Sequence, residues 1–239
     1  MSLGLATAWR IARRDLNPRF RGLRLLLVCL FLGTAALAAI GSLTTAIERE
    51  LARSGRELLG GDLEVELWQR DLAPPERAAL ARLGTISSGY RLQAMASTPT
   101  AAAPIELKAV DANWPLFGHL VLADGRRVGA PQGRDAWLAP GAIERLGISP
   151  GESFTVGTLR LRAAGVIRDE PDRLSEGFQL GPTVIVAADV PAAAGLLAPG
   201  ALYQSKHRIA FADPARAPDA AAEALKRQFP TAGFDFRTR

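Results

Sequence analysis

The chain has 239 residues and a formal net charge of +5, from 29 lysine and arginine side chains against 24 aspartate and glutamate side chains. The first 24 residues hold six arginines and one aspartate, so the rest of the chain is electrically balanced. A nucleic-acid partner is therefore not expected, because such a partner requires a basic face on the folded part. Cys29 is the single cysteine, which excludes an intrachain disulfide and a thiolate metal site.

Residues 1–24 form a basic arm. Its apolar residues recur at helical spacing, at Leu5, Trp9, Ala12 and Leu16, and its arginines fall mostly off that stripe. This pattern predicts a short amphipathic helix suited to an anionic membrane surface. The arginine cluster places the arm in the cytoplasm, because positive charge is retained on that side of a membrane.

Residues 25–47 contain no charged side chain. A helix of this length extends roughly 35 Å at about 1.5 Å per residue, enough to cross a hydrocarbon core of about 30 Å. The sequence therefore predicts a transmembrane helix, with the residues that follow it on the far side of the membrane.

A cleaved signal peptide is the alternative interpretation of a basic arm followed by an apolar stretch. The apolar stretch is longer than the roughly 7–15 residues of a signal peptide. The helical stripe also continues beyond it at Leu43, Ile47, Leu51 and Leu58. We therefore expect a retained span that continues as an amphipathic stalk over residues 48–61, ending at the helix-terminating pair Gly60-Gly61.

The remaining residues, 62–239, alternate between short strand and short helix patterns. Leu63, Val65 and Leu67 alternate with Glu64 and Glu66, which predicts a half-buried strand. Further strands are expected at 85–97, 105–109, 136–138, 154–156, 159–163, 165–167, 183–186, 203–211 and from 233 onward. The strands at 154–156 and 159–163 are expected to form a hairpin around Gly157-Thr158. Helices are expected at 76–83, closed by Gly84, and at 140–146, 189–197 and from 217. Such a mixture predicts an α+β periplasmic domain with two lobes, and a lobe boundary is expected near residues 118–135.

Motifs that carry chemistry are absent. The sequence contains no G-x-x-x-x-G-K-[ST] phosphate loop, no G-x-S-x-G elbow and no H-E-x-x-H zinc motif. We therefore predict no catalytic, cofactor-binding or metal-binding residues and no cofactor. The adjacent Ser87 and Ser88 have no histidine near them in sequence. The sequence leaves open whether a histidine lies close to them in the folded chain.

Isolated polar residues have simple structural explanations. His119 and His207 lack metal-ligand spacing and are expected on the surface or in loops. Asp169, Glu170 and Asp172 lack the glycine and the distal glutamate of a calcium loop and are expected in a solvated, mobile loop over residues 168–181. The aromatic segment 113–118 is expected to be a packing plug.

Short motifs in a fixed order resemble the N-terminal part of MacB/FtsX-type ABC transporter permeases, and most closely the branch associated with a lysophospholipase partner. The resemblance covers essentially the whole chain. It is carried by Ala8-Trp9-Arg10, Arg13-Arg14-Asp15, the apolar span, 58–64, 106–111, 114–118, Leu146-Gly147, Pro150-Gly151-Glu152, Glu170-Pro171-Asp172 and Gly181-Pro182.

The resemblance implies a permease subunit in a bacterial inner membrane, with its main domain in the periplasm. It implies export of a lipophilic or lipid-like substrate, with ATP hydrolysed by a separate ATP-binding subunit. Further implied partners are a second permease copy or permease half, and membrane lipid. The chain ends at Arg239, before the further spans of such permeases, so a fragment of a longer protein is expected. The alternative is a single-pass, membrane-anchored periplasmic binding or adaptor module.

Overall fold

The computed structural model describes residues 21–172 and 181–238. The predicted amphipathic helix of the arm lies almost wholly outside the described residues. Helix α2 (Arg21–Leu59) is continuous over 39 residues and covers both the predicted span and most of the predicted stalk. Its segment Leu25–Thr44 has a mean hydropathy of 2.3 and is exposed throughout, so it is long and apolar enough to cross a membrane.

Helix α2 ends where the sequence predicts. Gly60 adopts a positive φ of 72°, a conformation that glycine supplies at little cost after the last helical turn. The division of α2 into a membrane part and a stalk stays a prediction. By its internal contacts the chain forms two compact units, residues 1–52 and 53–239, and the second contains the sheet domain.

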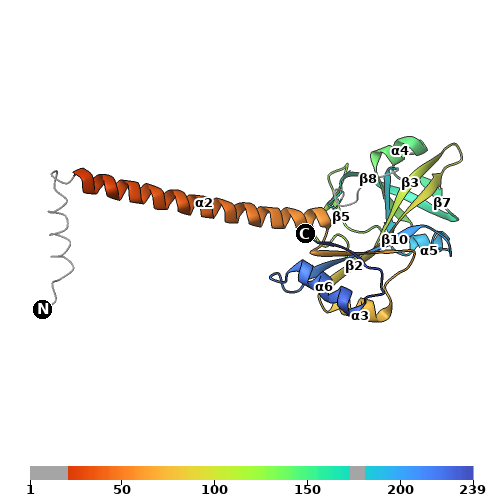
Figure 1. Cartoon of the computed structure of the whole chain (residues 1–239). Coiled ribbons are helices and arrows are strands. Elements are labelled where there is room, and N and C mark those ends of the chain that lie inside the picture. Colours follow the sequence, from red (N-terminus) through yellow and green to blue (C-terminus); the bar gives the residue numbers. More distant parts are fainter. Residues whose placement is uncertain (1–20, 173–180, 239) are drawn as a thin grey trace. The chain divides into compact units, whose positions relative to one another are not determined.

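The sheet domain is α+β, as predicted (Figure 1). Its helices are α3 (Pro74–Ala81), α4 (Pro140–Leu146), α5 (Val190–Ala193) and α6 (Pro218–Gln228). Its strands are β1 (Leu63–Trp68), β2 (Gly84–Ser97), β3 (Ala102–Val110), β4 (Leu120–Leu122), β5 (Arg127–Val128), β6 (Asp135–Leu138), β7 (Ser153–Val156), β8 (Leu159–Asp169), β9 (Thr183–Ala187), β10 (Tyr203–Phe211) and β11 (Asp235–Thr238).

The described strands form one mixed sheet in the order β11-β1-β10-β2-β3-β9-β6-β8-β4-β5, with β7 pairing with β2 and β8. Most neighbours are antiparallel, whereas β3 with β9 and β6 with β8 are parallel. The long strands β2 and β10 pair over nine residues, from Tyr203 opposite Leu92 to Phe211 opposite Gly84. Strands β2 and β10 therefore run through the centre of the sheet.

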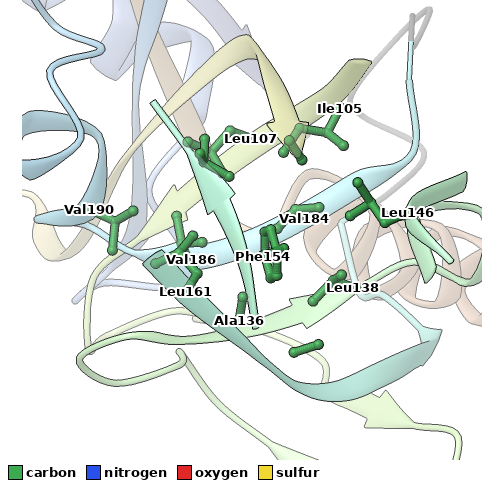
Figure 2. Close-up of a cluster of buried hydrophobic side chains, with 14 of the residues drawn as sticks. Ile105, Leu107, Ala136, Leu138, Leu146, Phe154, Leu161, Val184, Val186 and Val190 are labelled. Carbon is green, nitrogen blue, oxygen red and sulfur yellow. The ribbon is translucent and has the colours of Figure 1, made fainter. Parts of the chain in front are cut away.

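Two apolar cores lie along one face of these shared strands. The first packs Leu63, Val65 and Leu67 of β1 with Leu80 of α3 and Leu225 of α6. The second, drawn in Figure 2, collects side chains from β3, β6, β7, β8, β9 and α4 around Phe154. Along β2, Ile86 packs against the first core and Leu92 belongs to the second, so the two cores share this strand. The lobe boundary expected near 118–135 stays a prediction.

Three local expectations were wrong. Gly84 does not close α3, which ends at Ala81; it begins β2, where a Cβ would lie 1.9 Å from the carbonyl oxygen of Ala210. Helix α5 ends at Ala193, because Gly195 adopts a positive φ of 74°. Strand β1 is buried on both faces over Leu63–Leu67. On the second face, Glu64 and Glu66 are buried because they form ion pairs with Lys206 and Arg208 of β10.

Candidate functional site at the end of the long helix

One face of the sheet carries charged side chains of both signs, and we call it the charged face. Its members are Glu64 and Glu66 on β1, Lys206 and Arg208 on β10, Arg91 on β2, and Glu106 and Lys108 on β3. All are buried. Side chains alternate between the faces of a strand, so these residues point away from the apolar cores formed by their neighbours.

Ion pairs link the strands of the charged face. Glu64 lies directly opposite Arg208 and accepts a hydrogen bond from its Nε at 2.6 Å. Glu66 lies opposite Lys206, whose Nζ is 2.7 Å from Glu66 Oε1. Arg91 pairs with Glu106 on the neighbouring strand. Buried charges are tolerated only when they are paired and hydrogen-bonded, so this face requires every partner.

Glu170 and Asp172 complete the network from the segment after β8. Lys108 Nζ lies 2.6 Å from Glu170 Oε1 and 2.6 Å from Asp172 Oδ1. Asp172 also pairs with Arg208 and accepts a hydrogen bond from Trp114 Nε1 at 3.1 Å. The expectation that these two carboxylates are solvated was wrong, since Asp172 is only 1% exposed. Residues 173–180 of the expected loop lie outside the described residues.

The network lies directly at the end of α2. Arg56, in the last turn of the helix, donates from Nε to Asp62 Oδ1 at 2.8 Å, and Asp62 accepts the backbone N–H of Phe211 at 2.8 Å. A Cβ on Gly60 would lie 3.1 Å from Arg208 Cδ and 3.2 Å from Asp172 Cβ. The helix terminus is thus fixed against the charged face, and we call this contact region the joint.

The aromatic segment packs at the joint, as the plug interpretation predicts. Trp114 is buried, and Lys108 Nζ lies 5.0 Å from its ring centroid. The guanidinium of Arg56 lies 5.8 Å from the centroid of Phe117. These cation–π contacts hold two cations of the joint in place.

Two carboxyl groups of the charged face have lowered pKa values. For Asp172, burial alone would raise the pKa, but the positive charges of Arg208 and Lys108 and the hydrogen bonds from Lys108 and Trp114 outweigh it. For Glu66, burial likewise opposes ionisation, and Lys206 with Arg237 reverses the effect. Both carboxylates therefore stay charged under mildly acidic conditions.

We predict that the domain loses stability in acid as these carboxylates take up protons. A group with a depressed folded-state pKa stabilises the fold above its unfolded pKa, here 3.8 for Asp172, and this contribution is lost as the pH falls towards the folded value. Urea unfolding at about pH 6 and about pH 3 is expected to show a smaller pH difference for Asp172→Asn than for the unaltered chain. Glu223→Gln, at an exposed ion pair with Lys226, is the matched control. An unaltered pH difference in Asp172→Asn would contradict the assignment.

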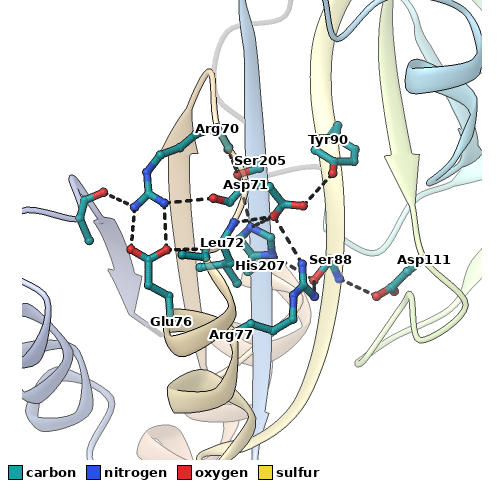
Figure 3. Close-up of polar contacts among 12 residues, drawn as sticks. Arg70, Asp71, Leu72, Glu76, Arg77, Ser88, Tyr90, Asp111, Ser205 and His207 are labelled. Atoms are coloured by element: carbon teal, nitrogen blue, oxygen red, sulfur yellow. Dashed lines mark hydrogen bonds and ion pairs between the residues drawn. The ribbon is translucent and has the colours of Figure 1, made fainter.

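A second polar cluster lies on the opposite face, between the two apolar cores (Figure 3). His207 Nδ1 lies 3.0 Å from Ser88 Oγ, and His207 Nε2 lies 3.2 Å from Asp71 Oδ1. Tyr90 donates its hydroxyl to Asp71 Oδ2 at 2.8 Å. Burial, together with this carboxylate, raises the pKa of Tyr90 to about 12. His119 is exposed as expected, but His207 is only 1% exposed, so its expected surface position was wrong.

The Ser88–His207–Asp71 arrangement has the residue types of a hydrolytic triad without the surrounding chemistry. The backbone N–H of Ser88 donates to Asp111 Oδ2 at 2.7 Å, which places a negative charge where an oxyanion would need donors. His207 is buried between two β-strand neighbours. We assign this cluster a structural role: it satisfies polar groups where the two cores meet.

Among residues 21–172 and 181–238, no group of three histidine, cysteine, aspartate or glutamate side chains is placed to hold a metal ion. The acidic residues of the charged face instead face lysine and arginine. The joint therefore consists of ion pairs, hydrogen bonds and packing contacts between the end of α2 and the sheet.

Sequence comparison gives one informative relative. No family model matches the chain. The chain is 29% identical over 188 residues to a protein of Escherichia coli (strain K12) described as the uncharacterized ABC transporter permease YbbP. The match covers 76% of this chain and 22% of that protein, so the chain spans about a fifth of the relative's length.

Structure comparison finds a similar fold in a solved periplasmic domain. The periplasmic region of MacB from Actinobacillus actinomycetemcomitans aligns with a TM-score of 0.51 at 11% identity, over 77% of this chain and 91% of that one. The resemblance to MacB-type ABC transporter permeases is confirmed. The MacB likeness establishes the fold, and the sequence likeness is to a permease. The extracellular domain of the ABC-type transporter YknZ from Gram-positive bacteria aligns at a TM-score of 0.49 and 12% identity, over 74% of this chain and all of that one.

Sequence reasoning missed the charged face although a signal was present. Strand β1 reads Glu-x-Glu and strand β10 reads Lys-x-Arg, so the two segments carry opposite charges at the same period of two. Complementary charge at strand spacing predicts a cross-strand pair. The sequence does not reveal the third partner, because Asp172 lies in the segment after β8, far along the chain from both β1 and β10.

Proposed function

We propose that this chain acts in an ABC transporter as part of its permease subunit, that the transporter moves a lipophilic substrate, and that a separate subunit hydrolyses the ATP. The observation that carries the proposal is the likeness to an ABC transporter permease over 188 residues. The apolar, exposed segment Leu25–Thr44 of α2 supports a membrane protein. The MacB-like fold supports an extracytoplasmic position for the sheet domain.

The orientation follows from the arginine-rich arm, which favours a cytoplasmic N-terminus and an external sheet domain. We further propose that the permease works as a pair, with a second copy or a second permease half. In this arrangement ATP-driven movement of the membrane helices is passed along α2 to the joint. Arg56 and Asp62 then transfer it to the sheet, because their bond ties the helix end to β1 and β10.

Copurification tests the proposal. The full-length gene product that contains this chain is tagged and extracted from its native membrane in mild detergent. We expect an ABC ATP-binding protein to copurify, and we expect the ATPase activity of the complex to exceed that of the isolated ATP-binding protein. Recovery of the tagged protein without any ATP-binding partner would contradict the proposal and favour a membrane-anchored binding module.

A further inference from the structure

Exposed apolar side chains of the sheet domain gather at one groove. Outside α2, the large apolar residues that are exposed in the described chain are Trp68, Met95 and Leu202. Trp68 and Leu202, at 60% and 74% exposure, both line a groove of about 980 Å³. Leu196 and Tyr203 also contribute to its lining. A hollow of this size with apolar walls is typical of small-molecule sites.

The charged side chains of the lining already have partners of opposite sign. Lys206 Nζ lies 2.7 Å from Glu66 Oε1, and Arg237 Nε lies 3.4 Å from the same oxygen. Arg91 pairs with Glu106. An ionic ligand would therefore lose hydration against a surface that has no countercharge to offer, and the desolvation of a charge without a partner is costly.

Two uncharged amides lie beside these ion pairs. Gln204 comes between Lys206 and Leu202 in the chain, and it lies opposite Arg91 on β2. Gln93 follows Arg91 by two residues, so it lies on the same face of β2. Within the described residues, neither side-chain amide makes a hydrogen bond to the protein. An amide both donates and accepts hydrogen bonds, so the lining offers polar contacts without net charge.

The groove wall holds its exposed tryptophan in place. Gln69, directly after Trp68, has a φ of 55° and is the one non-glycine residue of the described chain with a positive φ. Its N–H donates to the carbonyl of Tyr203 at 2.9 Å and its side chain to that of Ala201 at 3.4 Å. Strained backbone persists only where surrounding contacts hold it, and here these contacts fix the position of Trp68 at the groove edge.

The apolar surface of the groove is small for a protein partner. A stable protein interface buries roughly 800 Å² on each partner and depends on a cluster of apolar or aromatic anchors. Two exposed side chains on the walls of a hollow offer only a fraction of that area. The groove therefore fits a small lipophilic molecule better than a protein surface.

We propose that this groove binds an uncharged amphiphile, with a hydroxyl or ester group against the amides of Gln93 and Gln204 and a hydrocarbon chain along Trp68 and Leu202. The inference rests on the proposed function, because it names the substrate class of that permease as uncharged. The hydrocarbon gains affinity from the apolar area that it buries against the two exposed side chains. The uncharged polar group meets the amides without disturbing the ion pairs.

Tryptophan quenching compares ligands of different charge. The full chain with Trp9→Phe is placed in phosphatidylcholine nanodiscs and titrated with bromoundecanol, with bromoundecanoate and with bromoundecyltrimethylammonium. Each dissociation constant is expressed as the mole fraction of probe in the lipid, so that unequal partitioning of the probes cancels. Trp114 and Trp137 are 3% and 9% exposed, so Trp68 is the main reporter. We expect the alcohol to bind at least about fivefold more tightly than either ion. Equal or tighter binding of either ion would overturn the proposal.

Variants locate the two ends of the ligand. Gln204→Lys adds a cation to the groove and is expected to shift the preference from bromoundecanol towards bromoundecanoate at least about fivefold. Leu202→Ser is expected to raise the dissociation constant for bromoundecanol at least about fivefold. Met95→Ser, at a residue 56% exposed outside the groove, is the matched control and is expected to leave it unaltered. An unaltered preference in Gln204→Lys, or unaltered binding in Leu202→Ser, would overturn the assignment.

The outcomes separate this inference from the proposed function. The quenching assay needs neither ATP nor an ATP-binding subunit, so binding with no ATP-binding partner would leave the groove intact and remove the transporter. A functional transporter in which Leu202→Ser transports uncharged lipophilic substrate normally would remove the groove as the substrate site and leave the transporter intact. A Trp68 that no probe quenches, because a second copy of the chain covers it, would also overturn the groove alone.

Discussion

Replacing Lys108 with methionine is expected to lower the free energy of unfolding of the sheet domain by about 3–5 kcal/mol. Lys108 is 4% exposed and contacts both Glu170 and Asp172 at 2.6 Å. Removing the ammonium takes away a positive charge shared by two buried carboxylates, of which Asp172 retains its pair with Arg208. Methionine retains most of the volume, so the loss reports charge rather than a cavity. Urea unfolding followed by fluorescence measures it.

Two further variants define the origin of this loss. Arg126→Met removes the cation of an exposed pair with Asp124 and is expected to cost far less, because solvent screens an exposed ion pair. Adding Glu170→Gln to Lys108→Met removes one of the two buried negative charges that Lys108 contacts and should restore part of the stability. If Lys108→Met costs no more than Arg126→Met, the charged face does not hold the domain together as described.

Replacing Ala46 with proline is expected to reduce ATP-dependent transport by the full-length protein at least about tenfold while ATP hydrolysis continues. Position 46 lies inside the continuous helix α2. Proline removes a backbone hydrogen bond and clashes with the preceding turn, at a cost of about 3 kcal/mol or more, which kinks or breaks the helix. Transmission along α2 to the joint then fails. Transport and ATPase activity are measured on the same proteoliposomes.

Ala46→Leu is the matched control, because leucine is a good helix former and adds no kink. It is expected to retain coupling between ATP hydrolysis and transport. Normal coupling in Ala46→Pro would show that α2 does not transmit the movement as one rod, even if the protein is a permease.

Local patterns predicted much of this fold because the deciding interactions are close in sequence. The end of α2 at Gly60, the helix α4 with its left-handed Gly147, and the strand β10 follow from glycine geometry and from alternation. The error at Gly84 has a different cause. That glycine is required by the close approach of Ala210 on another strand, which no local pattern reveals.

The joint was less predictable than the fold. The polar composition of the segment around Glu170 and Asp172 predicts a solvated loop. The cations that pair with them, Lys108 and Arg208, are distant in sequence and come close only in the folded domain. Likewise His207 became buried because β10 runs through the middle of the sheet, between β1 and β2. Buried polar networks are long-range features, so a single sequence indicates their members only when the charges alternate, as on β1 and β10.

The most direct test of the proposed permease role uses proteoliposomes that contain the full-length gene product and its copurified ATP-binding subunit. Movement of a labelled lipophilic probe out of the bilayer is measured with and without ATP. The account predicts that movement requires ATP and is lost when the phosphate-loop lysine of the ATP-binding subunit is replaced. Movement that is independent of ATP, or ATP hydrolysis that is indifferent to the presence of this chain, would contradict it.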